Sequence, residues 1–90
     1  MEFEWDENKN ASNILKHGVD FDTASRVFGD PFHVTILSTS GNHGEVRELT
    51  AGTVGGVEIL TVVHTDRNGV TRIISARPAS NKERKTYHGP

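Results

Sequence analysis

The sequence predicts an α+β domain with a sheet of about four to five strands, two N-terminal helices and a short C-terminal helix. Helical periodicity is confined to the first 30 residues and the last ten or so, and strand-forming stretches fill the interval. Ninety residues suffice for one small core, so we expect residues 1–90 to form a single domain. Hydrophobic residues make up only 33% of the chain, which predicts a thin core that a partner chain would help to stabilise.

The N-terminal segment predicts a strand followed by a helix. Residues 2–5 alternate polar and aromatic side chains, as a short half-buried strand does. Asp6 is suited to cap a helix over about residues 7–17, and Gly18 is suited to end it in the left-handed conformation. We expect this helix to turn a narrow apolar stripe to the core, formed by Ala11, Ile14 and Leu15.

A second helix is predicted almost immediately after the first. Asp20 is its expected N-cap, and the turn-forming residues 29–31 are expected to close it. The residues at helical spacing that should form its buried face are Phe21, Ala24, Val27 and Phe28.

The rest of the chain predicts strands and one more helix. Strands are expected over residues 32–37, 45–51, 57–65 and 70–77. The third of these is apolar on both faces, which is typical of a central strand. Asn68 and Gly69 predict a two-residue type I′ hairpin, and a short helix is expected from about Ala79 to Tyr87.

This hairpin predicts which side chains share a face. With the turn at Asn68 and Gly69, opposing residues have numbers that sum to 137. Arg72 and Arg77 then lie on opposite faces unless a β-bulge intervenes. The face that is polar in its middle is expected to be open and carries Leu60, Val62, His64, Ile73, Ser75 and Arg77. The other is expected to pack on the two helices and carries Ile59, Thr61, Val63, Thr65, Arg72, Ile74 and Ala76.

Composition excludes several classes of protein. The chain has no cysteine, so it forms neither disulfides nor a zinc thiolate site, which fits the cytoplasm in which we expect it to act. No apolar run approaches the ~20 residues of a membrane span, and the acidic N-terminus is unlike a signal peptide, so no membrane partner is expected. Residues 1–30 hold seven acidic against three basic residues, and residues 66–85 hold two against six. The basic stretch predicts a localised anion site.

The chemistry of the polar residues favours metal-free cleavage of RNA. The five histidines lack the spacing of a metal site, and the chain has neither a nucleophile elbow nor a phosphate-binding glycine loop. We therefore expect no metal and no cofactor. Arginine can stabilise charge on phosphate, and histidine, or lysine and tyrosine with shifted pKa values, can carry the protons of an attack by the RNA 2′-hydroxyl.

Each of these residues also has a structural alternative. His17 could cap the first helix, and Arg72 could pair with Glu48 or Glu58. Arg77 could extend to water from the strand end, and the ring of Tyr87 could pack on the sheet with its hydroxyl bonded at the rim.

The order of short motifs resembles the BrnT toxin family over Phe3 to Tyr87. The motifs are Phe3-x-Trp5-Asp6-x-x-Lys9, Asn13-x-x-Lys16-His17-Gly18-Val19-x-Phe21, Ala24-x-x-Val27-Phe28-x-Asp30, Arg47, Gly52, Arg72-Ile73-Ile74-Ser75-Ala76-Arg77-x-Ala79 and Glu83-Arg84-x-x-Tyr87. The resemblance implies a RelE-like fold, with helices against a small antiparallel sheet. It also implies a type II toxin that cleaves RNA and inhibits translation.

The same resemblance implies partners and site residues. The partners are an RNA substrate and a cognate BrnA-like antitoxin, which binds DNA and alone brings the toxin to operator DNA. The expected catalytic residues are Lys16, His17, Arg72, Arg77 and Tyr87. The expected RNA-binding residues are Arg47, Arg67 and Arg84. The alternative is a non-catalytic module of the same fold that binds a protein or RNA without cleaving it.

Overall fold

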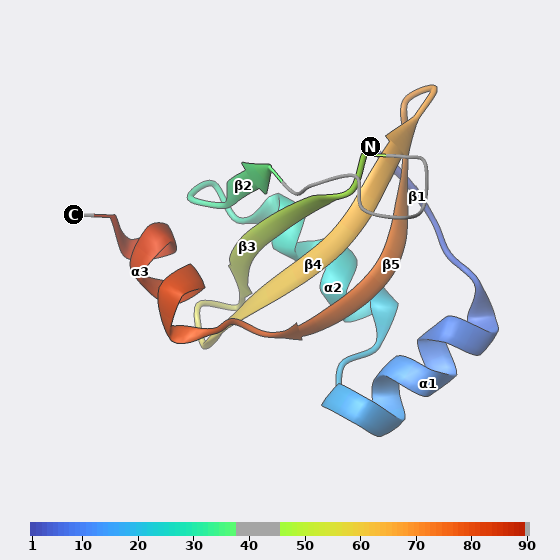
Figure 1. Cartoon of the computed structure of the whole chain (residues 1–90), viewed down its shortest axis with the longest axis horizontal. Coiled ribbons are helices and arrows are strands. Elements are labelled where there is room, and N and C mark those ends of the chain that lie inside the picture. The colour runs from blue at the N-terminus through green and yellow to red at the C-terminus, as the bar shows by residue number, and fades with distance from the viewer. Residues whose placement is uncertain (38–45, 90) are drawn as a thin grey trace.

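The computed structural model describes residues 1–37 and 46–89, and its elements follow the predicted order (Figure 1). They are β1 (Glu2–Glu4), α1 (Glu7–His17), α2 (Phe21–Ser25), the 3-10 helix η1 (Arg26–Gly29), β2 (Val34–Leu37), β3 (Glu48–Val54), β4 (Glu58–Arg67), β5 (Val70–Pro78) and α3 (Asn81–His88). Residue 45, the first residue of the strand that we expected over residues 45–51, lies outside the described residues. Within the described ranges, no helix is long and apolar enough to cross a membrane.

The sheet is mixed, and the α+β prediction is confirmed. Its strand order is β1-β5-β4-β3-β2, and every neighbouring pair is antiparallel except β1 with β5. The expectation of an antiparallel sheet is therefore wrong at this edge. Parallel neighbours need a long connection between them. Here both N-terminal helices and three strands separate β1 from β5 in the chain.

Local signals placed the ends of the first helix correctly. The Asp6 carboxylate accepts from the backbone N–H groups of Asn8 and Lys9, and Gly18 follows α1 with a φ of 70°. The second predicted helix is shorter than expected, because it turns into the 3-10 helix η1 after Ser25. Asn68 and Gly69 have φ values of 50° and 82°, as the predicted hairpin turn requires.

The face that α1 turns inward is polar, contrary to expectation. Leu15 is 88% exposed and Ile14 is 44% exposed, whereas Asn13 is buried against β5. The reason lies in β1: its pairing with β5 stops at Arg72, and no other strand among the described residues pairs with the backbone further along that edge. The Asn13 side chain fills this role: its amide nitrogen donates to the Ala76 carbonyl over 2.7 Å and its oxygen accepts from the Ala76 N–H over 3.1 Å.

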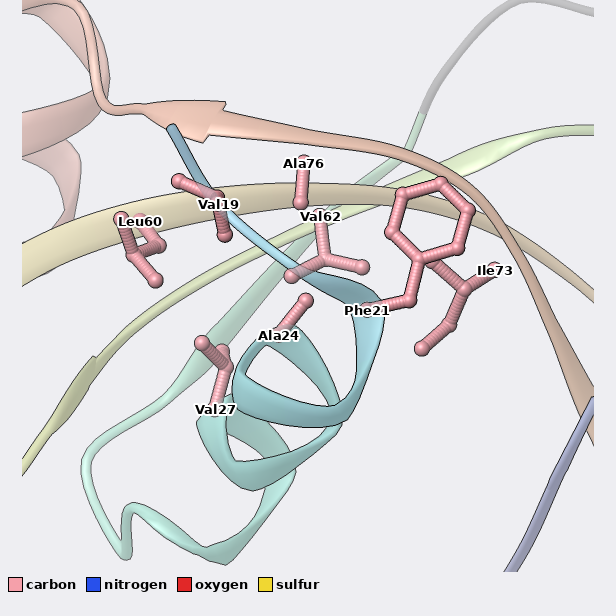
Figure 2. Packing of buried hydrophobic residues seen from close by; sticks show 8 residues of the cluster. All are labelled: Val19, Phe21, Ala24, Val27, Leu60, Val62, Ile73 and Ala76. Carbon is pink, nitrogen blue, oxygen red and sulfur yellow. The ribbon is translucent and has the colours of Figure 1, made fainter. Parts of the chain in front are cut away.

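The main core lies between the sheet and the helix α2 with η1, which run behind β3, β4 and β5 in Figure 1. Figure 2 shows the cluster of Val19, Phe21, Ala24, Val27, Leu60, Val62, Ile73 and Ala76. The predicted assignment of the faces is therefore wrong, because Leu60, Val62 and Ile73 pack on the helices. The burial of these hydrophobic side chains stabilises the packed arrangement more than the polar residues in the middle of the predicted face oppose it.

A β-bulge at Ile74 changes which residues of β5 share a face. The pairing of β4 with β5 shifts between Val63 and His64, so Thr65 opposes Arg72 as predicted but Thr61 opposes Arg77. Thr61 and Thr65 are four residues apart on one strand and point to the same side. Arg72 and Arg77 therefore both lie on the face opposite α2.

This second face is partly covered by α3. A small cluster joins the sheet to that helix and consists of Ala51, Ile59 and Ala79 with Val34 and Tyr87 packed against it. Ser80 begins the helix with a capping box: its hydroxyl accepts from the Glu83 N–H, and the Glu83 carboxylate accepts from the Ser80 N–H. The helix therefore lies closest to β3 and reaches β5 only near the C-terminal end of that strand (Figure 1).

Candidate active site

A polar groove of about 280 Å³ runs between α1 and the edge of β5. It is lined by Lys9, Ser12, Asn13, Lys16 and His17 from the helix and by Ile74 and Ser75 from the strand. The five helical residues recur at intervals of three and four, so they form one face of α1. This polar face, rather than the apolar stripe, is what the helix presents to the sheet.

Lys16 and His17 are brought together with the strand that carries the arginines. Both lie in the last turn of α1 and are exposed, so the ends of their side chains can reach a bound ligand. Asn13 fixes the helix here, because its amide also donates to the Val19 carbonyl just beyond Gly18 over 2.8 Å. The negative pole of the helix dipole favours the positive charge of Lys16 at this end of α1.

Arg77 follows the groove residue Ser75 by two positions on the same face, which places their Cα atoms about 6.6 Å apart. Its guanidinium binds Glu83 through two parallel hydrogen bonds, Nη1 to Oε1 at 2.7 Å and Nη2 to Oε2 at 2.9 Å. These bonds raise the pKa of Arg77 and are the main cause that lowers the pKa of Glu83 to about 2. The side chain of Arg77 stays 34% exposed.

Arg72 lies on the same face but at the other end of β5. Its Nη1 donates to Glu4 Oε2 over 2.9 Å, so the pairing with Glu48 or Glu58 that we considered is wrong in its partner. Five residues separate Arg72 from Arg77, which along a bulged strand corresponds to about 13–16 Å between Cα atoms. The two arginines therefore lie at opposite ends of β5.

Tyr87 is held away from the groove. Its hydroxyl donates to Asp30 Oδ2 over 2.6 Å, and this bond raises the pKa of the tyrosine. It packs over β3, and β4 and β5 lie between β3 and the groove edge, so strand spacing alone separates them by about 10 Å. Here the structural alternative for Tyr87, a ring on the sheet with a bonded hydroxyl, is confirmed.

The three predicted RNA-binding arginines are spread over the molecule. Arg47 precedes β3 and is half-buried, with a buried Nε that has no hydrogen-bond partner among the described residues. Arg67 is exposed at the hairpin end of β4. Arg84 lies on α3, where its Nε donates to the Ala79 carbonyl over 3.2 Å.

One group of possible metal ligands appears that spacing did not indicate. Donor atoms of Glu48, His64 and Asp66 all lie within 4.8 Å of one another. The buried imidazole already has a partner at each nitrogen, Thr50 Oγ1 at 2.8 Å from Nε2 and Asp66 Oδ1 at 3.4 Å from Nδ1. We therefore interpret the group as an oriented histidine with a carboxylate partner. His43, another of the histidines weighed in the sequence, lies outside the described residues.

Sequence reasoning missed the residues that hold the site together. Asn13, Asp30 and Glu83 are each largely buried and each bond groups from other elements. For Glu83 a signal was present, because Ser80-x-x-Glu83 has the spacing of a capping box. For Asn13 and Asp30 the partners lie 63 and 57 residues away, beyond the reach of local patterns.

Comparisons with known proteins agree with this architecture. Residues 5–83 match the family model described as the ribonuclease toxin BrnT of type II toxin-antitoxin systems. The chain is also similar to the ribonuclease toxin BrnT of Brucella abortus, known from a crystal structure at 1.1 Å resolution. The TM-score is 0.71 with 26% sequence identity, and the match covers 90% of this chain and 99% of that one. No curated protein matches the chain. The chain belongs to the BrnT family of type II toxin-antitoxin ribonuclease toxins.

Proposed function

We propose that the chain is a metal-independent endoribonuclease that cuts RNA at the groove between α1 and β5. The observation that carries this proposal is the groove itself, where Lys16 and His17 lie across from Ser75 on β5. The next residue of β5 on the same face as Ser75 is Arg77. Cleavage by the RNA 2′-hydroxyl needs a proton acceptor, a proton donor and a cation for the charged phosphorane. These side chains supply all three.

The residues divide the work according to their positions. Arg77 binds the scissile phosphate through charge-assisted hydrogen bonds that strengthen as negative charge builds up. His17 or Lys16 exchanges protons with the 2′-oxygen and the leaving 5′-oxygen. Arg72, at the far end of β5, contacts a neighbouring phosphate, and Arg47, Arg67 and Arg84 add attraction for the polymer. Tyr87 supports the site indirectly, because its hydrogen bond to Asp30 helps to hold α3 in place.

We further propose that the activity inhibits translation in the cytoplasm and is neutralised by a cognate antitoxin. The family's place in type II toxin-antitoxin systems supports a protein partner. A DNA-binding antitoxin of the BrnA kind would also carry the toxin to operator DNA. Arg47, Arg67 and Arg84 lie at separate places on the fold, which gives little support for DNA recognition by the chain alone.

Cleavage of a single-stranded RNA by the purified chain tests the proposal. We expect cleavage to persist in excess chelator and to fall at least about 100-fold in His17→Ala and Arg77→Ala. Arg72→Ala should lose less cleavage activity, because Arg72 is proposed to contact the phosphate next to the scissile one. The matched control is Arg26→Ala, since Arg26 is an exposed arginine that, within residues 1–37 and 46–89, pairs with the nearby Asp22 of α2.

Three outcomes would contradict parts of the proposal. Loss of cleavage in chelator would end the metal-free mechanism. Full activity in both His17→Ala and Arg77→Ala would place the chemistry elsewhere. RNA that is bound but never cut, with normal growth of bacteria induced to make the chain, would favour the non-catalytic module.

A further inference from the structure

Glu83 is bound from three sides by groups that fix its carboxylate. Besides the two bonds from Arg77, Oε1 accepts from Thr61 Oγ1 over 2.9 Å and from the Ser80 N–H over 2.8 Å. These donors come from β4, β5 and the start of α3, and the side chain is only 12% exposed. Such a carboxylate cannot swing away without leaving several donors unsatisfied.

The way Arg77 meets this carboxylate leaves part of the guanidinium available. Glu83 takes one N–H from each of the two terminal nitrogens, and Nη1 also approaches the Pro78 carbonyl at 3.4 Å. The remaining fork is the side edge formed by Nε and Nη2. Among residues 1–37 and 46–89 no hydrogen bond from Nε is found, and the side chain is one-third exposed. A phosphate can bind this edge in the bidentate manner that arginine favours.

We infer that Glu83 is a positioning residue, which holds the Arg77 guanidinium so that its free side edge meets the scissile phosphate. The inference rests on the proposed role of Arg77 in RNA cleavage. A long arginine side chain loses rotamer entropy when it is ordered, and a carboxylate that orders it beforehand removes that cost from the catalytic step. Through Glu83, α3 becomes part of the site although Glu83 itself touches no RNA.

The opposite role for the same contact makes a different prediction. If Glu83 competed with phosphate for the guanidinium, its removal would free Arg77 and tighten RNA binding. If Glu83 positions Arg77, its removal leaves the arginine mobile and slows the chemical step. The sign of the change in cleavage rate therefore separates the two.

The test is Glu83→Gln, which keeps the shape and replaces one acceptor by an amide N–H₂ facing Nη2. We expect kcat on single-stranded RNA to fall at least about tenfold while KM changes less than about threefold. In an Arg77→Lys background, which lacks the fork, the same change should cost less than about twofold. The control is Glu58→Gln, which removes an equal charge from an exposed position on β4. Thermal unfolding of each variant reports whether α3 stays folded.

A second variant covers the case in which Glu83→Gln unfolds. Thr61→Val removes one donor to Glu83 and keeps the ion pair, so it should lower kcat by a smaller factor, about two- to fivefold. Faster cleavage or tighter binding in Glu83→Gln overturns the inference, as does an equal loss in the Arg77→Lys background. Full activity in Arg77→Ala would instead refute the proposed role of Arg77 itself, which distinguishes the two failures.

Discussion

Tyr87 and Asp30, 57 residues apart in the chain, are joined by a 2.6 Å hydrogen bond from the phenol to Oδ2. The same oxygen accepts from the N–H of Thr53 over 2.8 Å, and Oδ1 accepts from the N–H of Phe32 over 2.9 Å. One buried carboxylate therefore ties α3 to β3 and to the segment between η1 and β2. The bonds, led by that from Tyr87, lower the pKa of Asp30 to about 2.

Acid should weaken the fold through Asp30. Its folded pKa of about 2 lies below the ordinary value of 3.8, so the stabilisation is complete above about pH 4 and is lost as pH falls through 2. We expect Asp30→Asn, and less strongly Tyr87→Phe, to flatten the fall in the free energy of unfolding between pH 4 and 2, measured by urea titration. Glu83 and Asp20, whose pKa values are also lowered, contribute to the remaining slope. An unchanged slope in Asp30→Asn, equal to that of the exposed-site control Asp22→Asn, would contradict this reading.

Asn13→Asp should destabilise the protein although the two side chains have nearly the same shape. An aspartate cannot donate to the carbonyls of Val19 and Ala76, and it places a charge at a buried position. We expect the free energy of unfolding to fall by about 2–4 kcal/mol, measured by urea denaturation. Asn8→Asp, at an exposed site on the same helix, is the control, and equal losses in both variants would show that Asn13 has no special role.

Gly52→Ala should be destabilising because η1 lies against this residue of β3. A Cβ atom there would lie 2.9 Å from Val27 Cγ1 and 3.1 Å from the Val27 carbonyl oxygen. Forcing these groups apart should cost about 1–3 kcal/mol, measured by thermal or urea unfolding. Gly29→Ala is the matched control, since within the described part of the chain a Cβ atom there meets no side chain or backbone outside its local segment within 4 Å. A tolerated alanine at position 52 would mean that η1 can move off the sheet.

The salt dependence of RNA binding should separate the charge of Arg77 from its geometry. For single strands each phosphate contact contributes a slope of about −0.7 to log K against log[salt]. Arg77→Ala should therefore reduce the slope by about 0.7, whereas Arg77→Lys should keep the slope and still cleave slowly. Filter binding over a salt series measures this. A slope that is the same in Arg77→Ala and in the unchanged chain would mean that Arg77 makes no phosphate contact.

Sequence reasoning succeeded where a few adjacent residues decide the structure. Asp6 and Gly18 fix the ends of α1 through bonds to their near neighbours, and Asn68 with Gly69 fixes the hairpin. The same holds for Lys16 and His17, whose position at the end of a helix followed from the cap beside them.

It failed where distant backbone sets the outcome. The apolar pair Ile14 and Leu15 predicted the inner face of α1. The N–H and carbonyl groups of Ala76 on β5 need hydrogen-bond partners there, however, and the Asn13 amide provides them. The partner of Arg77 could not be found from strand register, because Glu83 comes from a helix that folds back over the sheet. Strand alternation placed Arg72 and Arg77 on opposite faces, because it does not reveal the additional residue between them.

That additional residue, Ile74, is the reason that both arginines lie on one face of the sheet. Without it, alternation would point one arginine at the solvent and the other into the hydrophobic interior beneath α2. Single substitutions do not change the number of residues between Arg72 and Arg77, so they do not test whether the two arginines share a face because of the bulge. Inserting or deleting one residue in the hairpin would test it. Variation among relatives should accordingly be freer in side-chain identity at this position than in chain length between the two arginines.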